Sequence, residues 1–382
     1  MNTAVYAGTF DPVTNGHLWM IRTGARLFGH LVVAIGINPD KVPTFSLDER
    51  LSFIRDAIPD LINAGTVTLT CYEGLYLSDY ARSIGVPFIL RGIRGDADFG
   101  YEQVMRHVNA ELAADVETVF LMPPKMLAET SSSLVRGLVG PAGWRDAVSR
   151  YVPPSILEAF VRRHAVKRFV TLSGRLKASW PAADLGARLV ADWSDRGRHY
   201  HTANHLIDCL ERVDELVRSS EDGRLNQDQR NLVELALFFH DRILDTSDPA
   251  SRTGDQVSNE ERSALSLEHE ADPHLDPSIV SEAVRLVRLT ERHDPADEDY
   301  PGQVMCDCDL AILGADPERF DRYEADVRQE YAWVSDENWR TGRRAVVEKF
   351  LDRQTLFRTP YFQKRFENQA RENLRRSIQK LV

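Results

Sequence analysis

The sequence predicts an α/β domain, with a parallel sheet covered by helices on both faces, followed by an all-α domain. Over about the first 163 residues, apolar runs rich in β-branched side chains alternate with helix-like segments, as in a parallel sheet with helical crossovers. From residue 182 onward the periodicity is almost entirely helical. A chain of 382 residues is long enough for two domains with separate cores. We therefore expect domains at 1–163 and 179–382, joined by a linker at 164–178.

The predicted first domain starts with a strand at residues 4–7 and a helix at 18–28. Further strands are predicted at Leu31–Ile37, Val67–Tyr72, Val86–Leu90 and Val116–Met122. Helices are predicted at Leu47–Leu61, Leu77–Ile84, Phe99–Ala114 and Ser133–Leu138. Ligands of parallel sheets bind beyond the carboxyl ends of the strands, so we expect the loops that follow the strands to carry the chemistry.

The loop after the first strand, from Gly8 to His17, reads GTFDPVTNGH. A tight turn there would place backbone N–H groups, with Thr9 and His17, at the start of a helix, where phosphate binds readily. The stretch lacks the Gly-Lys-Ser/Thr ending of a P-loop and the G-x-G-x-x-G spacing of a dinucleotide-binding turn. It is therefore interpreted as a phosphate-binding corner that carries a histidine.

Cations and hydroxyls also follow three later strands. The stretches concerned are Asn38–Lys41, Arg91–Arg94, and Pro123–Lys125 with the nearby Ser131–Ser133. A single Lys or Arg in a loop is usually a solvated surface charge. Because the pattern recurs at equivalent positions of the predicted sheet, it favours a site for a polyphosphate.

Together, four motifs resemble bacterial phosphopantetheine adenylyltransferase, an enzyme family of coenzyme A biosynthesis, over residues 1 to about 163. They are GTFDPVTNGH, the Lys41 loop, RGIRGDADFGYE (Arg91–Glu102) and TSSSLVR (Thr130–Arg136). The resemblance implies a Rossmann-like nucleotidyltransferase fold. It also implies transfer of the adenylyl group of ATP to 4'-phosphopantetheine with Mg²⁺, giving dephospho-coenzyme A and pyrophosphate. A homo-oligomer, such as a hexamer, is a further implication.

By motif position, the resemblance implies that His17 stabilises the transition state, with Thr9, Lys41 and Arg91 as further catalytic residues. It implies that phosphopantetheine is bound by Thr9, Lys41, Leu77 and Arg91. It implies an ATP site formed by Thr9, Phe10, His17, Gly92, Ile93, Arg94, Glu102, Leu127, Ala128, Glu129, Thr130, Ser131, Ser132 and Ser133. No protein nucleophile is required, since the attacking group is already a phosphate anion that needs only alignment and charge stabilisation.

Simpler interpretations exist for some of these residues. Glu102 could be a surface carboxylate on its helix, and the serines at 131–133 could only cap a helix. The protonation state of His17 is open, because a helix N-terminus favours the neutral ring whereas a bound triphosphate favours the imidazolium. Ala7, Leu127 and Thr130 depart from residues that are common in the family, and we expect a modest effect on ATP affinity at most.

The second half is predicted to be helical throughout. The helices are expected at Leu185–Trp193, His201–Val217, Gln227–His240, Asn259–His269, Ile279–Thr290, Pro317–Val334, Thr341–Leu351 and Pro360–Leu381. His201 and His205 lie on one face of a helix, the pair His240-Asp241 ends another, and Asp307 and Asp309 precede an apolar run. If these helices converge, the mixed imidazole and carboxylate groups suit a divalent ion such as manganese, iron, nickel, zinc or magnesium.

Each of these signals is weak alone, but in order they resemble predicted HD-superfamily metal-dependent phosphohydrolases over residues 180–380. The motifs are RHYHTANHL, ALFFHDRILD, NEERSA and CDCDLAILG. The resemblance implies an all-α HD-type domain in which a divalent metal is held by His201, His240, Asp241 and Asp309. His205 and Asp307 are supporting or alternative ligands, and Asp245 and Glu260 could orient a water or hold a second ion.

The charge balance bears on partners and location. Residues 1–163 carry 15 Lys and Arg against 17 Asp and Glu, and residues 164–382 carry 32 against 41. Such a balance argues against nonspecific binding of nucleic acid or anionic membranes. Four scattered cysteines form no disulfide framework, and no apolar run approaches the roughly 18 residues of a membrane span. A cytoplasmic protein is therefore expected.

Two alternatives to this two-activity interpretation stay open at the level of the sequence. Phosphohydrolysis could be the main activity, with the first domain supplying or sensing nucleotide. Alternatively, the helical domain could be a catalytically silent regulatory or assembly module. The substrate of the helical domain and the reason for the fusion are not indicated by any residue.

Overall fold

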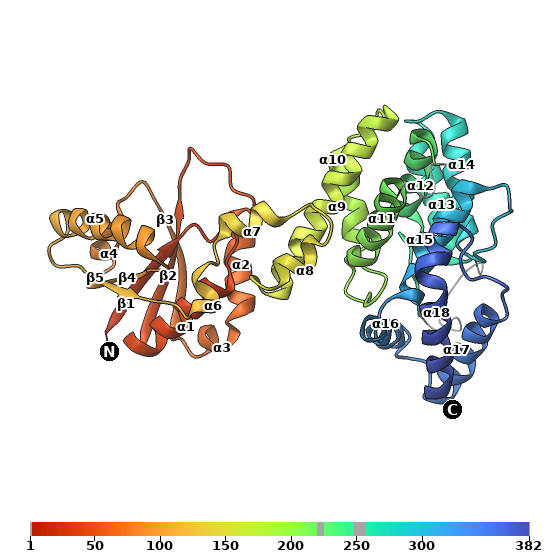
Figure 1. The fold of residues 1–382 in the computed structure, drawn as a ribbon. Coiled ribbons are helices and arrows are strands. Elements are labelled where there is room, and N and C mark those ends of the chain that lie inside the picture. Colours follow the sequence, from red (N-terminus) through yellow and green to blue (C-terminus); the bar gives the residue numbers. More distant parts are fainter. Residues whose placement is uncertain (1, 220–224, 248–256, 382) are drawn as a thin grey trace. The chain divides into compact units, whose positions relative to one another are not determined.

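The computed structural model describes residues 2–219, 225–247 and 257–381 (Figure 1). The chain divides into two compact units, residues 1–160 and 161–382, and the division falls within a helix, α9, that runs from Pro154 to Leu176. Most of the predicted linker at 164–178 is thus helical.

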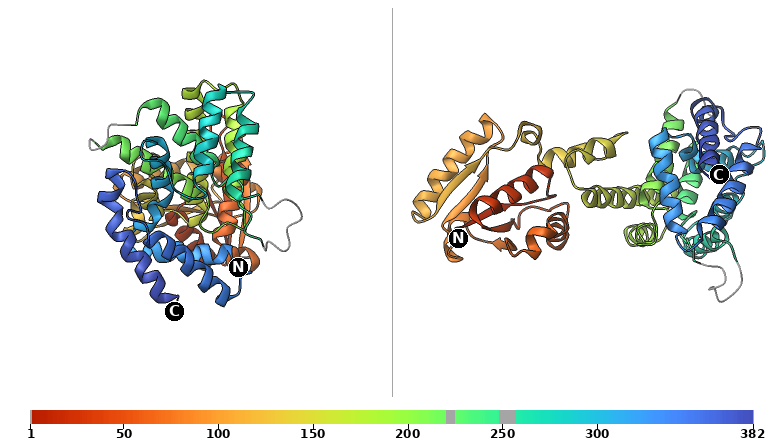
Figure 2. Two further views of the ribbon diagram at one scale, coloured as in Figure 1. Left: turned by 90° about the vertical axis from the view of Figure 1, so that its right-hand side faces the viewer. Right: turned by 90° about the horizontal axis from the view of Figure 1, so that it is seen from below.

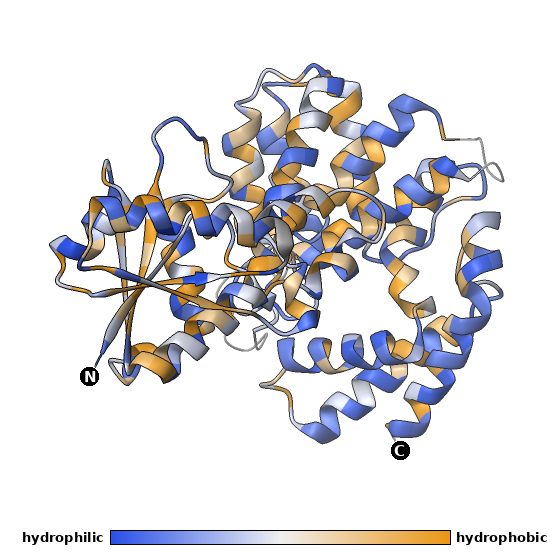
Figure 3. Cartoon of the chain, turned by 60° about the vertical axis from the view of Figure 1, so that its left-hand side comes forward, coloured by the Kyte–Doolittle hydropathy of each residue, from blue (hydrophilic) through white to orange (hydrophobic). Residues whose placement is uncertain are grey.

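The first unit is built on a five-stranded, fully parallel sheet in the order β3-β2-β1-β4-β5. Its strands are β1 Thr3–Gly8, β2 His30–Ile37, β3 Val67–Glu73, β4 Phe88–Gly92 and β5 Glu117–Leu121. In the register, Ala4 of the central strand pairs with Leu31 on one side and Phe88 on the other. The predicted Rossmann-like α/β fold is confirmed, and Figure 3 shows hydrophobic residues along the strands.

The helices of this unit are α1 Asn15–Phe28, α2 Leu47–Ala57, α3 Pro59–Asn63, α4 Leu77–Ser83, α5 Asp96–Leu112, α6 Lys125–Ala128, α7 Ser132–Leu138 and α8 Trp144–Ser149. The single helix predicted at 47–61 is divided into α2 and α3. The division occurs at Ile58, because Pro59 disfavours the helical conformation of the residue before it and starts a new helix.

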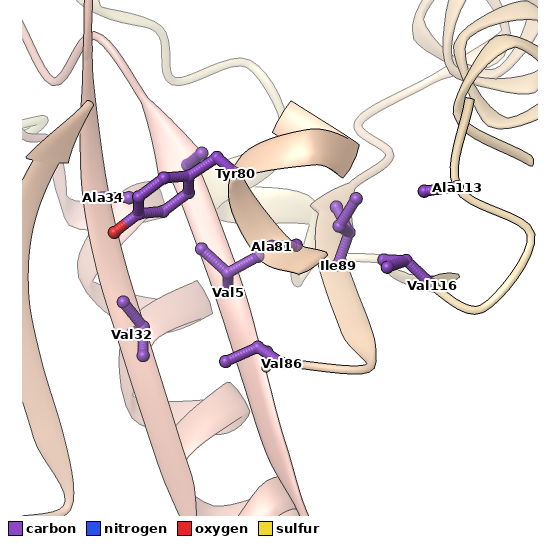
Figure 4. Packing of buried hydrophobic residues seen from close by; sticks show 10 residues of the cluster. Val5, Val32, Ala34, Tyr80, Ala81, Val86, Ile89, Ala113 and Val116 are labelled. Carbon is purple, nitrogen blue, oxygen red and sulfur yellow. The ribbon is translucent and has the colours of Figure 1, made fainter. Parts of the chain in front are cut away.

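Helices cover both faces of the sheet. On one face, Tyr80 and Ala81 of α4 pack in a core cluster with Val5 and Val32 (Figure 4). Leu31 precedes Val32 in β2 and therefore points to the opposite face. There it meets α1, where a Cβ on Gly24 would lie 3.2 Å from Leu31. This close approach fixes α1 on the sheet, and with it the loop that precedes α1.

The described part of the second unit contains helices and connecting segments but no strand (Figure 2). After α9 come α10 Ala182–Asp192, α11 Ala203–Arg218, α12 Gln227–Phe239, α13 Asn259–Ala271, α14 Pro277–Leu289, α15 Tyr300–Leu310, the 3₁₀ helix η2 Ala311–Gly314, α16 Pro317–Glu330, α17 Asp336–Leu351 and α18 Pro360–Lys380. The apolar α12 contacts α11, α13, α14 and α15, so it is central to this core.

The sequence did not predict α9 or α15. Helix α15 has almost all of its side chains buried, so it shows no polar face and no amphipathic period. Among the described helices, none combines the length and the apolarity required to span a membrane.

Candidate functional site

The first candidate site lies where β1 ends and α1 begins. Thr14 caps α1 by accepting a hydrogen bond from the N–H of His17, and the N–H of Thr14 donates in return to Nδ1 of His17 at 3.1 Å. Because Nδ1 accepts this bond, the proton of the neutral ring is on Nε2. Burial, with a smaller contribution from Arg94, lowers the pKa of His17 to about 4. His17 is therefore a neutral N–H donor when no ligand is bound.

A cleft of about 730 Å³ opens at this corner and is lined by residues from every loop that was predicted to carry chemistry. The predicted site residues that line it are Thr9, His17, Lys41, Arg91, Gly92, Arg94, Glu102, Leu127, Thr130, Ser131, Ser132 and Ser133. The structure thus brings the four separate motifs to one end of the sheet.

The other predicted residues do not line the cleft: Phe10, Leu77, Ile93, Ala128 and Glu129. Phe10 is buried and packs edge-on against the ring of His17, with centroids 5.1 Å apart. Leu77 packs against the core beneath α4, and Ile93 is buried.

Arg91 and Glu102 form a mostly buried ion pair at the cleft. Nε of Arg91 donates to Oε2 of Glu102 at 2.8 Å, and Nη2 donates to Oε1. Glu102 is only 8% exposed, so the alternative of a surface carboxylate is wrong. Ser131 does cap α7, since its hydroxyl accepts from the N–H of Leu134 at 3.1 Å.

Asp11 and Arg50 support this corner and were given no role from the sequence. The carboxylate of Asp11 accepts from the N–H groups of Thr44 and Phe45 at 2.8 and 2.9 Å. Arg50 donates to the carbonyl of Thr9 at 2.8 Å. These bonds tie the loop that carries Lys41 to the corner that carries His17. Asp11 lies in the GTFDPVTNGH motif, but its partners are more than 30 residues away and have no sequence signal.

The second candidate site is a cluster of imidazoles and carboxylates in the helical unit. Nε2 of His240, just after α12, is 3.2 Å from Oδ2 of Asp241 and 3.5 Å from Oδ1 of Asp309 on α15. Nε2 of His205, on α11, is 3.1 Å from the same oxygen of Asp309 and 3.4 Å from Nε2 of His240. Nε2 of His201 is 4.0 Å from Oδ2 of Asp241.

The spacing and chemistry of this cluster fit a divalent ion. Ligand atoms held about 2 Å from a metal lie roughly 3–3.5 Å from one another, close to the separations between these nitrogens and oxygens. His205, Cys209, His240 and Asp309 offer ligand atoms that all lie within 4.8 Å of one another. The Sγ of Cys209 is 3.7 and 3.8 Å from the two ring nitrogens of His205, so it packs beside this ring.

The two carboxylates dominate the electrostatics of the cluster. Burial disfavours a charge on His240, but Asp241 and Asp309 outweigh burial and raise its pKa well above the usual value. Burial also disfavours a charge on Asp241, yet His240 and His201 lower the pKa of this carboxyl. Without a metal, a proton on the imidazole of His240 is therefore favoured, and it compensates part of the buried negative charge.

Each imidazole of the cluster has a hydrogen-bond partner on its other nitrogen. Nδ1 of His201 is 2.7 Å from Glu330, Nδ1 of His205 is 3.0 Å from the hydroxyl of Tyr200, and Nδ1 of His240 is 2.9 Å from a backbone carbonyl, that of Leu237. This arrangement is typical of metal-binding histidines, which are oriented by a partner on the far nitrogen.

Asp309 has an equivalent partner, since Nε2 of His293 is 2.8 Å from its Oδ2. His293 has a left-handed backbone conformation, with φ of 49°. The sequence did not single out His293 or Glu330, because each lies in a segment without a recognisable motif, and it gave no role to Tyr200, which lies within RHYHTANHL.

The remaining predicted residues of this half lie elsewhere. Asp307 is buried, but its carboxylate accepts from the N–H groups of Arg358 and Thr359, both at 2.8 Å, at the start of α18. The structure does not bring it into the cluster. Asp245 accepts from the backbone N–H of Ser247 at 3.0 Å, and Glu260 lies in the first turn of α13.

Comparison with known proteins gives relatives for the first unit. Residues 5–138 match a family model described as cytidylyltransferase-like. Phosphopantetheine adenylyltransferase from Chromobacterium violaceum is 47% identical over 156 residues, which is 41% of this chain and 93% of that protein. The protein of the same name from Neisseria meningitidis serogroup C is 48% identical over 161 residues, or 42% of this chain and 93% of that protein.

A solved structure, Plasmodium falciparum nicotinic acid mononucleotide adenylyltransferase complexed with NaAD, aligns with 44% of this chain and 98% of its own. Its identity to this chain is 14%, and the TM-score is 0.32. The two phosphopantetheine adenylyltransferases show the family, because this chain covers 93% of each of them. Through its N-terminal residues, the chain belongs to the phosphopantetheine adenylyltransferase family of nucleotidyltransferases.

Proposed function

We propose that residues 1–163 transfer the adenylyl group of ATP to 4'-phosphopantetheine, giving dephospho-coenzyme A and pyrophosphate. The observation that carries this proposal is the single cleft at which His17, Lys41, Arg91 and the 131–133 serines meet. The identity of 47% to a protein of that name supports it. We place the reaction in the cytoplasm, with no nucleic-acid or membrane partner.

In the proposed mechanism, a phosphate oxygen of phosphopantetheine attacks the α-phosphorus of ATP as the bond to the β-phosphate breaks and pyrophosphate leaves. Lys41, Arg91 and Thr9 hold the attacking phosphate, with Leu77 on the pantetheine side. The Nε2–H of His17 donates to the α-phosphate oxygens as negative charge develops on them, which lowers the barrier without a covalent intermediate. Proposed ATP contacts come from Phe10, Gly92, Ile93, Arg94, Glu102, Leu127, Ala128, Glu129, Thr130, Ser131, Ser132 and Ser133.

Mg²⁺ would supply charge neutralisation for the triphosphate. The carboxylates that line the cleft already have hydrogen-bond partners: Asp11 binds backbone N–H groups, Asp98 binds Arg94, and Glu102 binds Arg91. The residues present therefore suit a Mg²⁺ ion held mainly by phosphate oxygens rather than a site made of protein ligands.

Replacing His17 by Ala should lower kcat for pyrophosphate release by about 10²–10³-fold, because a preorganised donor to the developing charge is lost. Turnover is measured with ATP and 4'-phosphopantetheine, and thermal unfolding checks that the loss of the α1 cap has not unfolded the domain. His30→Ala is the matched control, since His30 binds Thr68 away from the cleft. Wild-type turnover in His17→Ala would rule out the proposed role.

We also propose a homo-oligomer formed through the first unit, with a hexamer implied by the family. Helix α5 supports this, because several of its large apolar side chains are exposed, among them Phe99 at 51% and Val104 at 60%. Exposed apolar surface of this kind is typical of interfaces. Light scattering on the full chain should give a multiple of 43.3 kDa. A monomer at micromolar concentration would contradict the proposal.

For residues 179–382 we propose an HD-type domain in which a divalent metal supports phosphohydrolysis of a substrate that no residue identifies. The proposed ligands are His201, His240, Asp241 and Asp309, with His205 as a supporting or alternative ligand. A bound divalent ion would polarise a phosphoryl oxygen and activate water. The chain itself would hold the imidazoles and carboxylates in place and keep the centre largely closed to bulk water.

The alternative is a catalytically silent regulatory or assembly module. One observation favours it: the cavity beside His205 and Asp309 that the described residues enclose measures only about 10 Å³, too little for a phosphate ester. In a catalytic domain, the substrate would have to approach from the side of His201, whose side chain is 23% exposed.

Metal analysis of the purified chain separates these alternatives. We expect one or more equivalents of a divalent metal in the wild type and loss of that metal in His240→Ala and Asp241→Ala, because each removes a ligand from a closed centre. His269→Ala, an exposed histidine of α13, should retain the metal. A wild-type chain that neither contains nor takes up divalent metal would favour the silent module.

Metal affinity should rise with pH. The pKa of His240 is raised above its usual range in the metal-free centre, so near neutral pH a metal must displace a proton from this imidazole. We therefore expect proton release on Zn²⁺ binding at pH 7, less release at higher pH, and weaker binding as the pH falls. Calorimetry in buffers of different ionisation enthalpy measures this. Zn²⁺ binding that is independent of pH between about 6 and 8 would show that the metal does not displace a proton from His240.

A further inference from the structure

Glu330 is the last residue of α16 and its side chain is completely buried against the segment that carries His201. Its Oε1 accepts hydrogen bonds from three consecutive backbone N–H groups, those of His199, Tyr200 and His201, at 2.8, 2.9 and 2.9 Å. Its Oε2 is 2.7 Å from Nδ1 of His201. One carboxylate therefore holds both the backbone and the ring of a single histidine.

We propose that Glu330 is a positioning residue that keeps the proton of His201 on Nδ1, so that the lone pair of Nε2 faces the cluster and can bind a metal. The inference rests on the proposed function, in which His201 is a ligand. It adds a residue that lies outside every motif of the helical domain.

The tautomer follows from the geometry. An ionised carboxylate can only accept hydrogen bonds, so the group that faces it must donate. Oε1 is already occupied by three backbone donors, which leaves Oε2 for Nδ1 of the ring. In the neutral ring Nε2 then carries no proton, and the nearest carboxylate oxygen that it faces, Oδ2 of Asp241, is 4.0 Å away. That distance is too long for a competing hydrogen bond but leaves room for an ion between the two atoms.

Arg198 makes the backbone part of this arrangement rigid. Its guanidinium donates to the carbonyl of His201 at 3.0 Å and to the carbonyls of Asp241 and Arg242, both at 2.7 Å. The two segments that supply His201 and Asp241 are thus joined through one side chain. Because Arg198 and the three N–H bonds fix the backbone, the hydrogen bond that Oε2 accepts from the ring is left to determine which ring nitrogen carries the proton.

The decisive variant is Glu330→Gln, which keeps the size of the side chain and one acceptor oxygen. Three backbone donors demand that the amide oxygen occupy the place of Oε1. The amide NH₂ must then face Nδ1 of His201, which becomes an acceptor, and the ring proton moves to Nε2. The variant should therefore bind Zn²⁺ about 10–100-fold more weakly while retaining its fold.

Glu324→Gln is the matched control. It lies on the same helix, and its carboxylate binds Arg343 and Ser377 rather than a histidine of the cluster. We expect wild-type Zn²⁺ affinity in this variant. Both affinities are measured by competition with a chelator, and thermal unfolding of the metal-free chains checks the fold.

The tautomer is read directly in long-range ¹⁵N–¹H spectra of histidine-labelled full-length chain, metal-free and at a pH where the rings are neutral. We expect the proton of His201 on Nδ1 in the wild type and on Nε2 in Glu330→Gln. Weaker Zn²⁺ binding with an unchanged tautomer would reduce Glu330 to a packing role and overturn the proposal. So would wild-type affinity in Glu330→Gln.

If Glu330→Gln does not fold, the wild-type spectrum still decides, because a proton on Nε2 of His201 would overturn the proposal. Failure of the role proposed for Glu330 is distinguishable from failure of the proposed metal centre. A wild-type chain that binds no Zn²⁺ contradicts the metal centre, whereas the tautomer of His201 tests the role of Glu330 whether or not a metal binds.

Discussion

The hydrogen-bond partner of Nδ1 determines which nitrogen carries the proton in the neutral rings of His17 and His201. In the first unit a backbone N–H, that of Thr14, donates to Nδ1 of His17. In the second a carboxylate, that of Glu330, faces Nδ1 of His201 at 2.7 Å. A donor on Nδ1 leaves a proton on Nε2, which suits a phosphate oxygen, whereas an acceptor on Nδ1 leaves a lone pair on Nε2, which suits a metal. The same side chain thus has a hydrogen-bond donor on Nδ1 in one half and an acceptor on Nδ1 in the other.

Each of these bonds depends on the fold around it. His17 is held because Thr14 caps α1, and α1 is held close to the sheet at Gly24. His201 is held because α16 ends at Glu330, more than 100 residues later in the sequence. In the first unit, His17 and the residue that orients its ring, Thr14, both lie within the ten-residue motif GTFDPVTNGH. In the second unit, the orientation of His201 is created only when distant helices pack together.

This difference explains how much the sequence could predict. The strand and helix alternation, the parallel sheet and the convergence of loops at the carboxyl ends of strands follow from periodicity and topology. The burial of Glu102 against Arg91 does not, because an acidic residue on a helix is usually exposed. Nor do Asp11, Glu330 and His293, whose partners lie in other segments and leave no pattern in the sequence.

Asp307 and Asp309 show the same limit within a single motif. Two residues apart on α15, they point to roughly opposite sides of the helix, since successive residues are about 100° apart. Only one of them could face the cluster, and the sequence alone favoured Asp309 by motif position while keeping Asp307 as a supporting or alternative ligand. The structure turns Asp309 toward His205 and His240, and it turns Asp307 toward the backbone at the start of α18.

One spectrum of the full-length chain can distinguish the tautomers of His17 and His201. Long-range ¹⁵N–¹H correlations of the wild-type chain, free of ligand and metal and at a pH where both rings are neutral, show which nitrogen carries each proton. We expect a proton on Nε2 of His17 and on Nδ1 of His201. The same tautomer in both rings would show that the partners on Nδ1 do not determine where the protons lie.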